Sequence, residues 1–324
     1  MSKKSQVLWG AIARLCKASD AKIFGSRRPN ITTLASASSG SEGALSFIAS
    51  NRHDRQSLAD RCNSSVIICD PAVEKAAMLG RRATIIVTEK PRELFLEICG
   101  AIFPKPSINS IHESAVIYRG STIGLNVALG AHSVIDGAVV GDGTEIGAHC
   151  YIGSSVVIGR GVRIKAGSVI GGDGFGYVRT AGDRIVNMPH IGRVIIEDNV
   201  HVGSNSTIDR GSLVDTVIGP DSKLDNLVHI SHNVRIGARC LLAAHVVICG
   251  SARLEDDCYC GPSSVVEYGL SVGIGAVVGS GSCVKRNVPN GEVWLGNPAI
   301  KLEAFYRRDA AIRRLLPVSH SKGA

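Results

Sequence analysis

The chain has 324 residues, enough for two domains or one long repeat array. Its 37 glycines, with aromatic residues at only 4%, are unusual for an ordinary two-layer domain and indicate many tight corners with few bulky core side chains. A formal net charge of +8 leaves two interpretations open: an acidic partner (nucleic acid, anionic lipid or an acidic carrier protein) or simply a soluble basic surface.

The ten cysteines contain no C-x-x-C pair, and the closest two are Cys258 and Cys260. We expect small buried hydrophobic residues in a reducing cytosol, because several lie at apolar repeat positions. Arg14 and Lys17 break the N-terminal apolar stretch, so no secretory signal is expected. No run approaches 18 apolar residues, which predicts a soluble, cytoplasmic protein with at most peripheral membrane contact.

Residues 1–105 differ from the rest of the chain in their pattern. A helical period runs through 6–17, and further helices are predicted near 53–61 and 91–101. Strand-like runs occupy 44–50, 64–70 and 83–88, and Pro104 and Pro106 follow. This alternation predicts a small α/β domain over 1–105.

From Ile111 onward the apolar residues recur every six positions. The register slips by one residue after Ile135, resumes at Ile196 after an interruption over 171–193, and continues to Val214. A second block then gives twelve consecutive matches from Ile218 to Val284. This period predicts short strands whose sixth side chain points inward, with 18 residues per triangular coil and about 4.8 Å between coils. We therefore expect a mainly β protein, with about nine coils over residues 106–295.

Two other segments interrupt or end this array. The loop GGDGFGYV (171–178) has glycines spaced as in phosphate-binding loops, but no helix pattern follows, so a dinucleotide fold is not expected. Residues 296–324 contain a predicted helix at 301–316. One face of it is apolar and the other is basic, and it can cap the array.

The hexapeptide array resembles the left-handed parallel β-helix acyltransferases. More specifically, the chain resembles the UDP-3-O-(3-hydroxyacyl)glucosamine N-acyltransferase family of lipid A biosynthesis. The matching segments are 43–53, 171–178, 191–219, 223–237 and 296–315, including GDGFGY, TIDRG and DN-x5-HN.

The resemblance implies a homotrimer with active sites in the grooves between neighbouring prisms. It implies a uridine-binding N-terminal domain and a C-terminal helix that helps to engage acyl carrier protein. The donor is then a 3-hydroxyacyl thioester on the carrier's phosphopantetheine, with no other cofactor. The acceptor is the 2-amine of UDP-3-O-(3-hydroxyacyl)glucosamine.

An amine that attacks a thioester needs a base and donors for the oxyanion. Ile230 points inward, so His229 and His232 are both expected to face outward. By resemblance His232 is the general base, whereas His229 matches no family residue and is expected to be ordinary surface. Eighteen residues beyond His232 lies Gly250, one coil further on the same face. The resemblance makes its backbone N–H the oxyanion donor; the alternative is an ordinary turn glycine.

Other roles are implied only by the resemblance. Asp225 and Asn226 match residues that contact the sugar or phosphates beside the base, unless they are polar surface residues. Phe47 matches an aromatic that stacks on uracil, unless it belongs to the core. Four arginines of the C-terminal helix are expected to dock the acidic carrier, unless they merely solvate the helix: Arg307, Arg308, Arg313 and Arg314.

Two positions depart from the family pattern. His53 stands where a second stacking residue, a tyrosine, is common, and Gly269 stands where the family often has a second histidine. Two alternatives therefore stay open: an acetyl-CoA-dependent nucleotide-sugar acetyltransferase, and a catalytically weak binding or scaffold paralogue. Zinc is not expected, because the histidines lack the spacing of the zinc-dependent branch. Nucleic acid is not expected either, because no recognised module appears.

Overall fold

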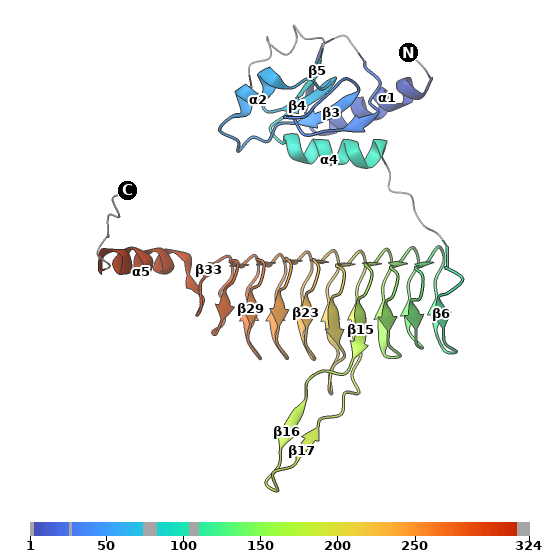
Figure 1. The fold of residues 1–324 in the computed structure, drawn as a ribbon, viewed down its shortest axis with the longest axis vertical. Coiled ribbons are helices and arrows are strands. Elements are labelled where there is room, and N and C mark those ends of the chain that lie inside the picture. Colours follow the sequence, from blue (N-terminus) through green and yellow to red (C-terminus); the bar gives the residue numbers. More distant parts are fainter. Residues whose placement is uncertain (1–2, 26–27, 74–82, 104–109, 316–324) are drawn as a thin grey trace, which may run out of the picture. The chain divides into compact units, whose positions relative to one another are not determined.

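The computed structural model describes residues 3–25, 28–73, 83–103 and 110–315 (Figure 1). The chain divides into two compact units, Met1–Ser107 and Ile108–Ala324, which are described separately. Pro104, Pro106 and the last predicted helical residue, Leu316, lie outside the described residues. No helix within these ranges is long and apolar enough to cross a membrane.

The N-terminal unit is a five-stranded sheet with the order β1-β5-β4-β3-β2, in which only β1 is antiparallel to its neighbour. Its strands are β1 (Lys22–Phe24), β2 (Thr33–Leu34), β3 (Ala44–Phe47), β4 (Val66–Cys69) and β5 (Thr84–Val87). Its helices are α1 (Lys3–Ala18), α2 (Arg55–Arg61) and α4 (Pro91–Ile102). Strands β3, β4 and β5 and the three helices coincide closely with the predicted runs, whereas β1 and β2 were not predicted.

Strand β4 explains why the apolar runs of this unit are continuous. Val66 and Ile68 pack with residues of α1 and α4, whereas Ile67 and Cys69 pack on the opposite face with Ala59 of α2. All four strand residues are buried. A parallel strand covered on both faces needs apolar residues at every position, so it does not alternate.

The second unit is a left-handed parallel β-helix with three sheets. The period of six predicted the coils, and the family resemblance predicted their hand. The first sheet contains β6 (Val116–Ile117), β9 (Val134–Ile135), β12 (Tyr151–Ile152), β15 (Val169–Gly172), β20 (Thr207–Asp209), β23 (His229–Ile230), β26 (Val247–Ile248), β29 (Val265–Val266) and β32 (Cys283–Val284). The second contains β7 (Thr122–Ile123), β10 (Val139–Val140), β13 (Val156–Ile158), β18 (Val194–Ile196), β21 (Thr216–Ile218), β24 (Arg235–Ile236), β27 (Arg253–Leu254) and β30 (Ser271–Val272).

The third sheet contains β8 (Ala128–Leu129), β11 (Glu145–Ile146), β14 (Arg163–Ile164), β19 (His201–Val202), β22 (Lys223–Leu224), β25 (Leu241–Leu242), β28 (Tyr259–Cys260), β31 (Val277–Val278), β33 (Val293–Leu295) and the antiparallel β34 (Ile300–Lys301). The sheets have nine, eight and ten strands, so the described coils number about nine, as expected.

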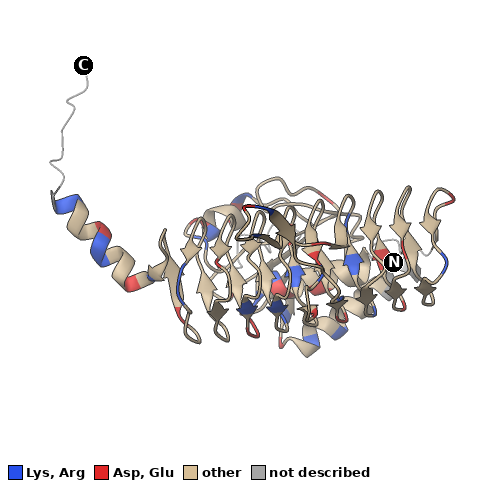
Figure 2. Cartoon of the chain, turned by 90° about the horizontal axis from the view of Figure 1, so that it is seen from below, with Lys and Arg blue, Asp and Glu red and all other residues tan. Residues whose placement is uncertain are grey.

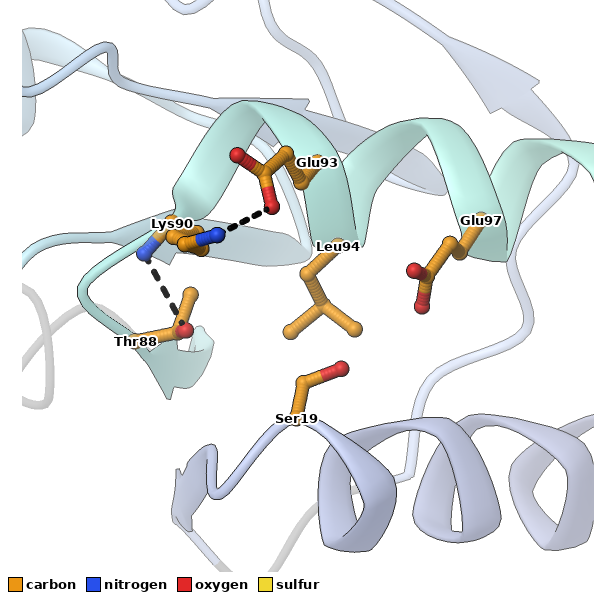
Figure 3. A pocket seen from close by; sticks show the side chains of 6 residues that line it. All are labelled: Ser19, Thr88, Lys90, Glu93, Leu94 and Glu97. Atoms are coloured by element: carbon orange, nitrogen blue, oxygen red, sulfur yellow. Dashed lines mark hydrogen bonds and ion pairs between the residues drawn. The ribbon is translucent and has the colours of Figure 1, made fainter.

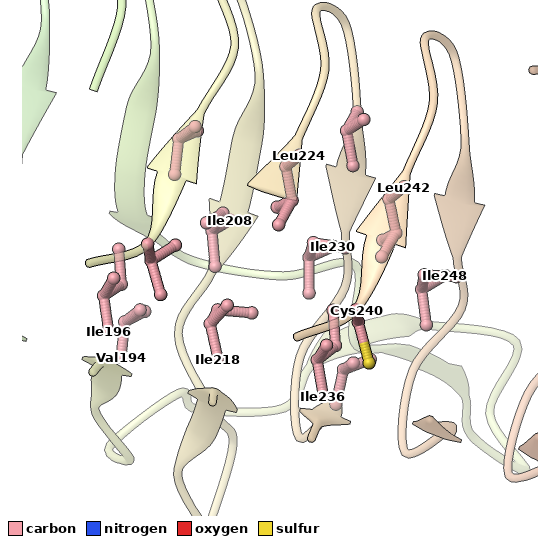
Figure 4. Packing of buried hydrophobic residues seen from close by; sticks show 14 of the residues in the cluster. Val194, Ile196, Ile208, Ile218, Leu224, Ile230, Ile236, Cys240, Leu242 and Ile248 are labelled. Carbon is pink, nitrogen blue, oxygen red and sulfur yellow. The ribbon is translucent and has the colours of Figure 1, made fainter. Parts of the chain in front are cut away.

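The register of the coils follows the 18-residue step. Ile230 pairs with Ile248, which lies 18 residues on and one coil further along. Both side chains are fully buried in a single column of apolar residues (Figure 4). Cys240, Cys258 and Cys260 are free thiols buried in this column.

Three predicted inward positions are wrong. Ile111 and Ile117 are 48% and 40% exposed, because they belong to the first coil and have a neighbouring coil on one side only. Val214 is 53% exposed because the coil that contains it is longer: Ile208 pairs with Ile230, 22 residues on. The four extra residues form a protruding corner, so the register resumes at Ile218 and not at Val214.

The interruption at 171–193 is an excursion from one coil. It leaves after β15 and forms an antiparallel hairpin of β16 (Tyr177–Arg179) and β17 (Ile185–Asn187), which projects from the array (Figure 1). At the C-terminal end of the array, β34 leads into helix α5 (Leu302–Leu315), close to the predicted 301–316.

Candidate functional site

His232 lies at the corner that follows strand β23. Its neighbour Asn233 has a φ of +62°, which asparagine tolerates better than most residues, and is held from both sides. The Asn233 N–H donates to Thr216 Oγ1 (2.9 Å), and its Oδ1 accepts from the Ser212 N–H (2.8 Å). The corner that presents His232 is therefore fixed by hydrogen bonds within the array.

Gly250 occupies the equivalent corner one coil further on, in contact with the His232 ring. A Cβ atom on Gly250 would lie 2.8 Å from Cε1 and 2.9 Å from Nε2 of His232. Real Cβ atoms essentially never approach so closely, so only glycine fits beside the ring as it stands. The structure thus brings together the two residues that the repeat count and the resemblance had paired.

The backbone around Gly250 leaves one amide available. The N–H groups on either side are engaged, since Cys249 donates to Val266 O (2.9 Å) and Ser251 donates to His232 O (3.0 Å). Within the described residues, the Gly250 N–H donates no hydrogen bond. A rigidly held free amide beside an imidazole is the arrangement that stabilises an oxyanion.

His190 is a member of this site that sequence reasoning missed. Its side chain is only 6% exposed, and its ring lies edge-on to His232 with 5.4 Å between the ring centroids. Gly174 of the excursion packs over both rings: a Cβ there would lie 3.0 Å from His232 Cδ2 and 3.1 Å from His190 Nε2. His190 directly precedes the matching segment 191–219 and has no place in the six-residue register, so only a tertiary contact reveals it.

Asp209 supplies the carboxylate of the site. Its side chain is largely buried, and burial raises its pKa to about 6, an effect that His190 opposes and Asp173 reinforces. His229 is half-buried and is not a free surface residue: its Nδ1 is 2.7 Å from Thr207 Oγ1, and its Nε2 is 3.8 Å from Asp209 Oδ2. Asp209 is thus a second site residue that the sequence did not single out, although it lies in the motif TIDRG.

The protonation state of His232 follows from its surroundings. Burial lowers its pKa, and the neighbouring His190 lowers it further. His232 is therefore the neutral imidazole near pH 7, the form that can accept a proton. Its Nδ1 is buried, whereas Nε2 lies beside Gly250.

Tyr268 covers the site from the next coil. Its ring centroid is 6.4 Å from that of His232, and its Cε2 would be 3.2 Å from a Cβ on Gly250. Its hydroxyl is 3.4 Å from Ser251 Oγ. Gly269, at the position where the family often has a histidine, has a φ of +71° and open space around it.

Asp225 and Asn226, which were expected to contact the acceptor beside the base, lie at a different corner of the array from His232. They form the corner before strand β23, whereas His232 lies in the corner after it. Asn226 Oδ1 accepts from the Ser204 N–H (2.8 Å), and Asp225 Oδ1 accepts from the Asn226 N–H (2.8 Å). Asn226 thus ties two coils together, as Asp142, Asp198, Asp256 and Asn290 do at other corners.

Phe47 and His53 belong to the N-terminal unit. Phe47 is half-buried and packs on Phe95, with 4.7 Å between the ring centroids, whereas His53 is exposed. A cleft of about 230 Å³ in this unit lies elsewhere, between the end of α1 and the start of α4 (Figure 3). It is lined by Ser19, Thr88, Lys90, Glu93, Leu94 and Glu97, so it includes neither predicted stacking residue.

All four predicted arginines of helix α5 are exposed. Figure 2 shows the Lys and Arg positions of this helix in blue. Arg308 lies over the ring of Phe305, 5.5 Å from its centroid, and Arg313 forms an ion pair with Asp309 (2.9 Å). Arg307 bonds back to Glu303 O (3.4 Å). The helix therefore presents an exposed, mostly basic surface at the end of the array.

The coils of the second unit are similar to the hexapeptide repeats of known proteins. Models of the bacterial transferase hexapeptide repeat match residues 137–172 and 215–250, and a model of the succinyltransferase hexapeptide repeat matches 193–226. The chain is also similar to curated proteins named UDP-3-O-acylglucosamine N-acyltransferase. That of Methylobacterium nodulans is 43% identical over 158 residues, 49% of this chain and 45% of the relative. That of Caulobacter sp. strain K31 is 43% identical over 159 residues, 48% of this chain and 46% of the relative. The chain spans about half the length of the curated relatives it matches.

Solved structures share the coil architecture. The UDP-N-acetylglucosamine acyltransferase of Francisella novicida matches with a TM-score of 0.55 and 27% identity, covering 61% of this chain and 73% of that one. The enzyme of the same name from Campylobacter jejuni matches with a TM-score of 0.54 and 23% identity, covering 64% and 81%, and this likeness shows the fold alone.

Proposed function

We propose that the chain is an N-acyltransferase that moves a 3-hydroxyacyl group from acyl carrier protein to the 2-amine of UDP-3-O-(3-hydroxyacyl)glucosamine. The observation that carries this proposal is the contact between the His232 ring and Gly250, whose N–H donates no hydrogen bond in the described structure. The similarity to N-acyltransferases of that name supports the choice of substrate.

The roles follow from which atoms face each other. The amine nitrogen attacks the thioester carbon, and the carbonyl oxygen becomes an oxyanion that accepts a hydrogen bond from the Gly250 N–H. His232 Nε2 takes the proton that the attacking nitrogen must lose. When the C–S bond breaks, the imidazolium returns this proton to the departing thiolate of the phosphopantetheine. His232 is therefore neutral again at the end of each turnover.

The remaining groups bind and steer. The exposed arginines of α5 are suited to an acidic carrier protein, because opposite charges accelerate encounter. Phe47 and His53 are proposed to hold the uridine. Asp225 and Asn226 lie one strand away from His232, so they are proposed to contact a more distant part of the acceptor. A homotrimer would place such corners in grooves between neighbouring prisms.

Product analysis tests the reaction directly. The purified chain is incubated with a mixture of 3-hydroxyacyl carrier thioesters and UDP-3-O-(3-hydroxyacyl)glucosamine, and the products are examined by mass spectrometry. The expected product carries one additional 3-hydroxyacyl group, bound as an amide that survives mild base. Product formed from acetyl-CoA alone would replace the proposal with an acetyltransferase. Acceptor binding without any product would indicate a binding paralogue.

Charge reversal tests the carrier surface. The pairs Arg307→Glu with Arg308→Glu, and Arg313→Glu with Arg314→Glu, are compared with a control pair on the coils, Arg235→Glu with Arg253→Glu. Both control arginines are exposed. We expect the α5 pairs to raise the KM for carrier thioester several-fold at low salt, with little effect on kcat. An equal rise in the control pair would contradict a specific surface.

A further inference from the structure

Two adjacent histidines contain three buried nitrogen atoms that lack a hydrogen-bond partner among the described residues. His190 Nδ1 and Nε2 and His232 Nδ1 are all buried, and none has a hydrogen-bond partner in the described part of the chain. An unpaired buried polar group costs roughly 1–3 kcal/mol, and folded proteins leave few of them without a reason. Three in one place indicate that the site is built for a task other than stability.

The excursion encloses this pair of rings. Gly174 packs against both, and a Cβ on Gly176 would lie 2.9 Å from His190 Cε1. The Met188 N–H donates to Gly176 O (2.5 Å), so the two strands of the hairpin are joined at its base, close to His190 in the chain. His190 is therefore held in a fixed orientation against His232 and has no room to swing away.

The charged and titratable groups around the rings are few. Asp209 lies on the neighbouring strand β20, with Asp173 on the excursion and His229 and Tyr268 on the coils. The guanidinium of Arg210 is engaged elsewhere, with Gly192 O (3.0 Å) and Ser155 Oγ (2.8 Å). A positive charge on His190 therefore acts chiefly on two groups, attracting the Asp209 carboxylate and opposing protonation of His232.

We infer that His190 is a positioning residue for the proposed acyl transfer, which orients the His232 ring toward Gly250 and keeps His232 in its proton-accepting form. The ring contact supplies the orientation, since the edge of one imidazole lies against the other. A charge on His190 favours the neutral, proton-accepting form of His232, since two cations this close repel. The expected effects on the rate rest on the proposed function, whereas the expected effect of His190 on the pKa of His232 does not.

The direct test is an NMR titration of the His232 ring in the wild-type chain and in His190→Gln. Glutamine keeps hydrogen-bonding groups but cannot carry the charge, so the pKa of His232 should rise by at least about half a unit. His190→Asn provides a second neutral variant, and thermal melting shows which variant keeps the fold. The exposed His245→Asn serves as the control and should leave the titration unchanged. An unchanged His232 titration in a folded neutral variant would overturn the inference.

A kinetic test separates positioning from a merely structural role. The acid limb of the pH–rate profile should move to higher pH in His190→Gln, with the rate at high pH within a few-fold of wild type. His190→Ala should lose rate at all pH values as well, because the ring contact is gone. A uniform loss in His190→Gln without movement of the limb would overturn the inference. Absence of turnover in the wild-type chain would reject the proposed function and leave the titration as the deciding measurement.

Discussion

The coils of residues 194–284 and the excursion of residues 171–193 use their side chains in opposite ways. In the coils, the inward residues form a continuous buried apolar column, and buried hydroxyls such as that of Ser222 find backbone acceptors, although the Ser264 hydroxyl has no partner in the described structure. In the excursion, Phe175, Tyr177 and Ile185 are exposed, while His190 is buried with unpaired nitrogens. The periodic part thus supplies a rigid frame, and the irregular part brings polar groups against it, which is how binding and catalytic sites are commonly built.

Replacing His232 should give the largest functional effect and the smallest structural one. His232→Asn removes the group proposed to take the amine proton, and general-base catalysis typically contributes roughly 10²–10⁴-fold. We expect kcat for acyl transfer to fall by a factor in that range, with the melting temperature little changed. His245→Asn, the same substitution at an exposed corner of a neighbouring coil, should retain full activity. Near-normal turnover in His232→Asn would show that another group is the base.

Replacing Ile230, the inward residue near His232, should instead give a large loss of folding stability. Ile230 is fully buried between Ile208 and Ile248, so Ile230→Ala leaves a cavity in the column. Such substitutions cost about 2–5 kcal/mol of unfolding free energy. The control Leu241→Ala removes an apolar side chain that is 47% exposed, and should cost much less. Denaturant unfolding measures both, and equal losses would contradict the assignment of inward and outward positions.

The sequence predicts the frame well and the site only in part, for one physical reason. The period of six reports which side chains enter a uniform column, so Ile230, and with it the pairing of His232 with Gly250, could be placed by counting. Counting fails where residues are inserted, so Val214 was misplaced. It also cannot find His190, because that residue reaches His232 through a segment that has no repeat at all. The structural use of Asn226 was missed for a related reason, since its partner Ser204 lies on another coil.

The buried Asp209 side chain, which lies where the excursion meets the coils, should destabilise the folded chain once it is ionised. Burial raises its pKa to about 6, so as pH rises the unfolded chain releases this proton before the folded chain does. Folding stability should therefore decline between about pH 4 and pH 6, and the cost should persist above that window. Asp209→Asn should raise the unfolding free energy at pH 7.5 by an amount on the order of 2 kcal/mol. The gain should vanish below about pH 4.

Chemical denaturation at pH 4 and pH 7.5 measures this difference. The exposed Asp221→Asn is the matched control and should change little at either pH. A loss of stability in Asp209→Asn at pH 7.5 would mean that the carboxylate is stabilised by the surrounding histidines more than it is penalised by burial.

Removing the Tyr268 hydroxyl should give the smallest effect, because the ring of Tyr268, and not its hydroxyl, lies over the site. The ring lies over Gly250 and near His232, whereas the hydroxyl makes only a 3.4 Å contact with Ser251 on an exposed surface. Tyr268→Phe keeps the ring and should change kcat/KM by less than about threefold, as expected for a weak exposed hydrogen bond. Tyr268→Ala should lose more, because it uncovers the corner where the oxyanion is proposed to form. Tyr259→Phe, on the same array but away from this corner, is the control. If Tyr268→Phe proved as damaging as Tyr268→Ala, the hydroxyl itself would take part in the reaction, in the place of the histidine absent at Gly269.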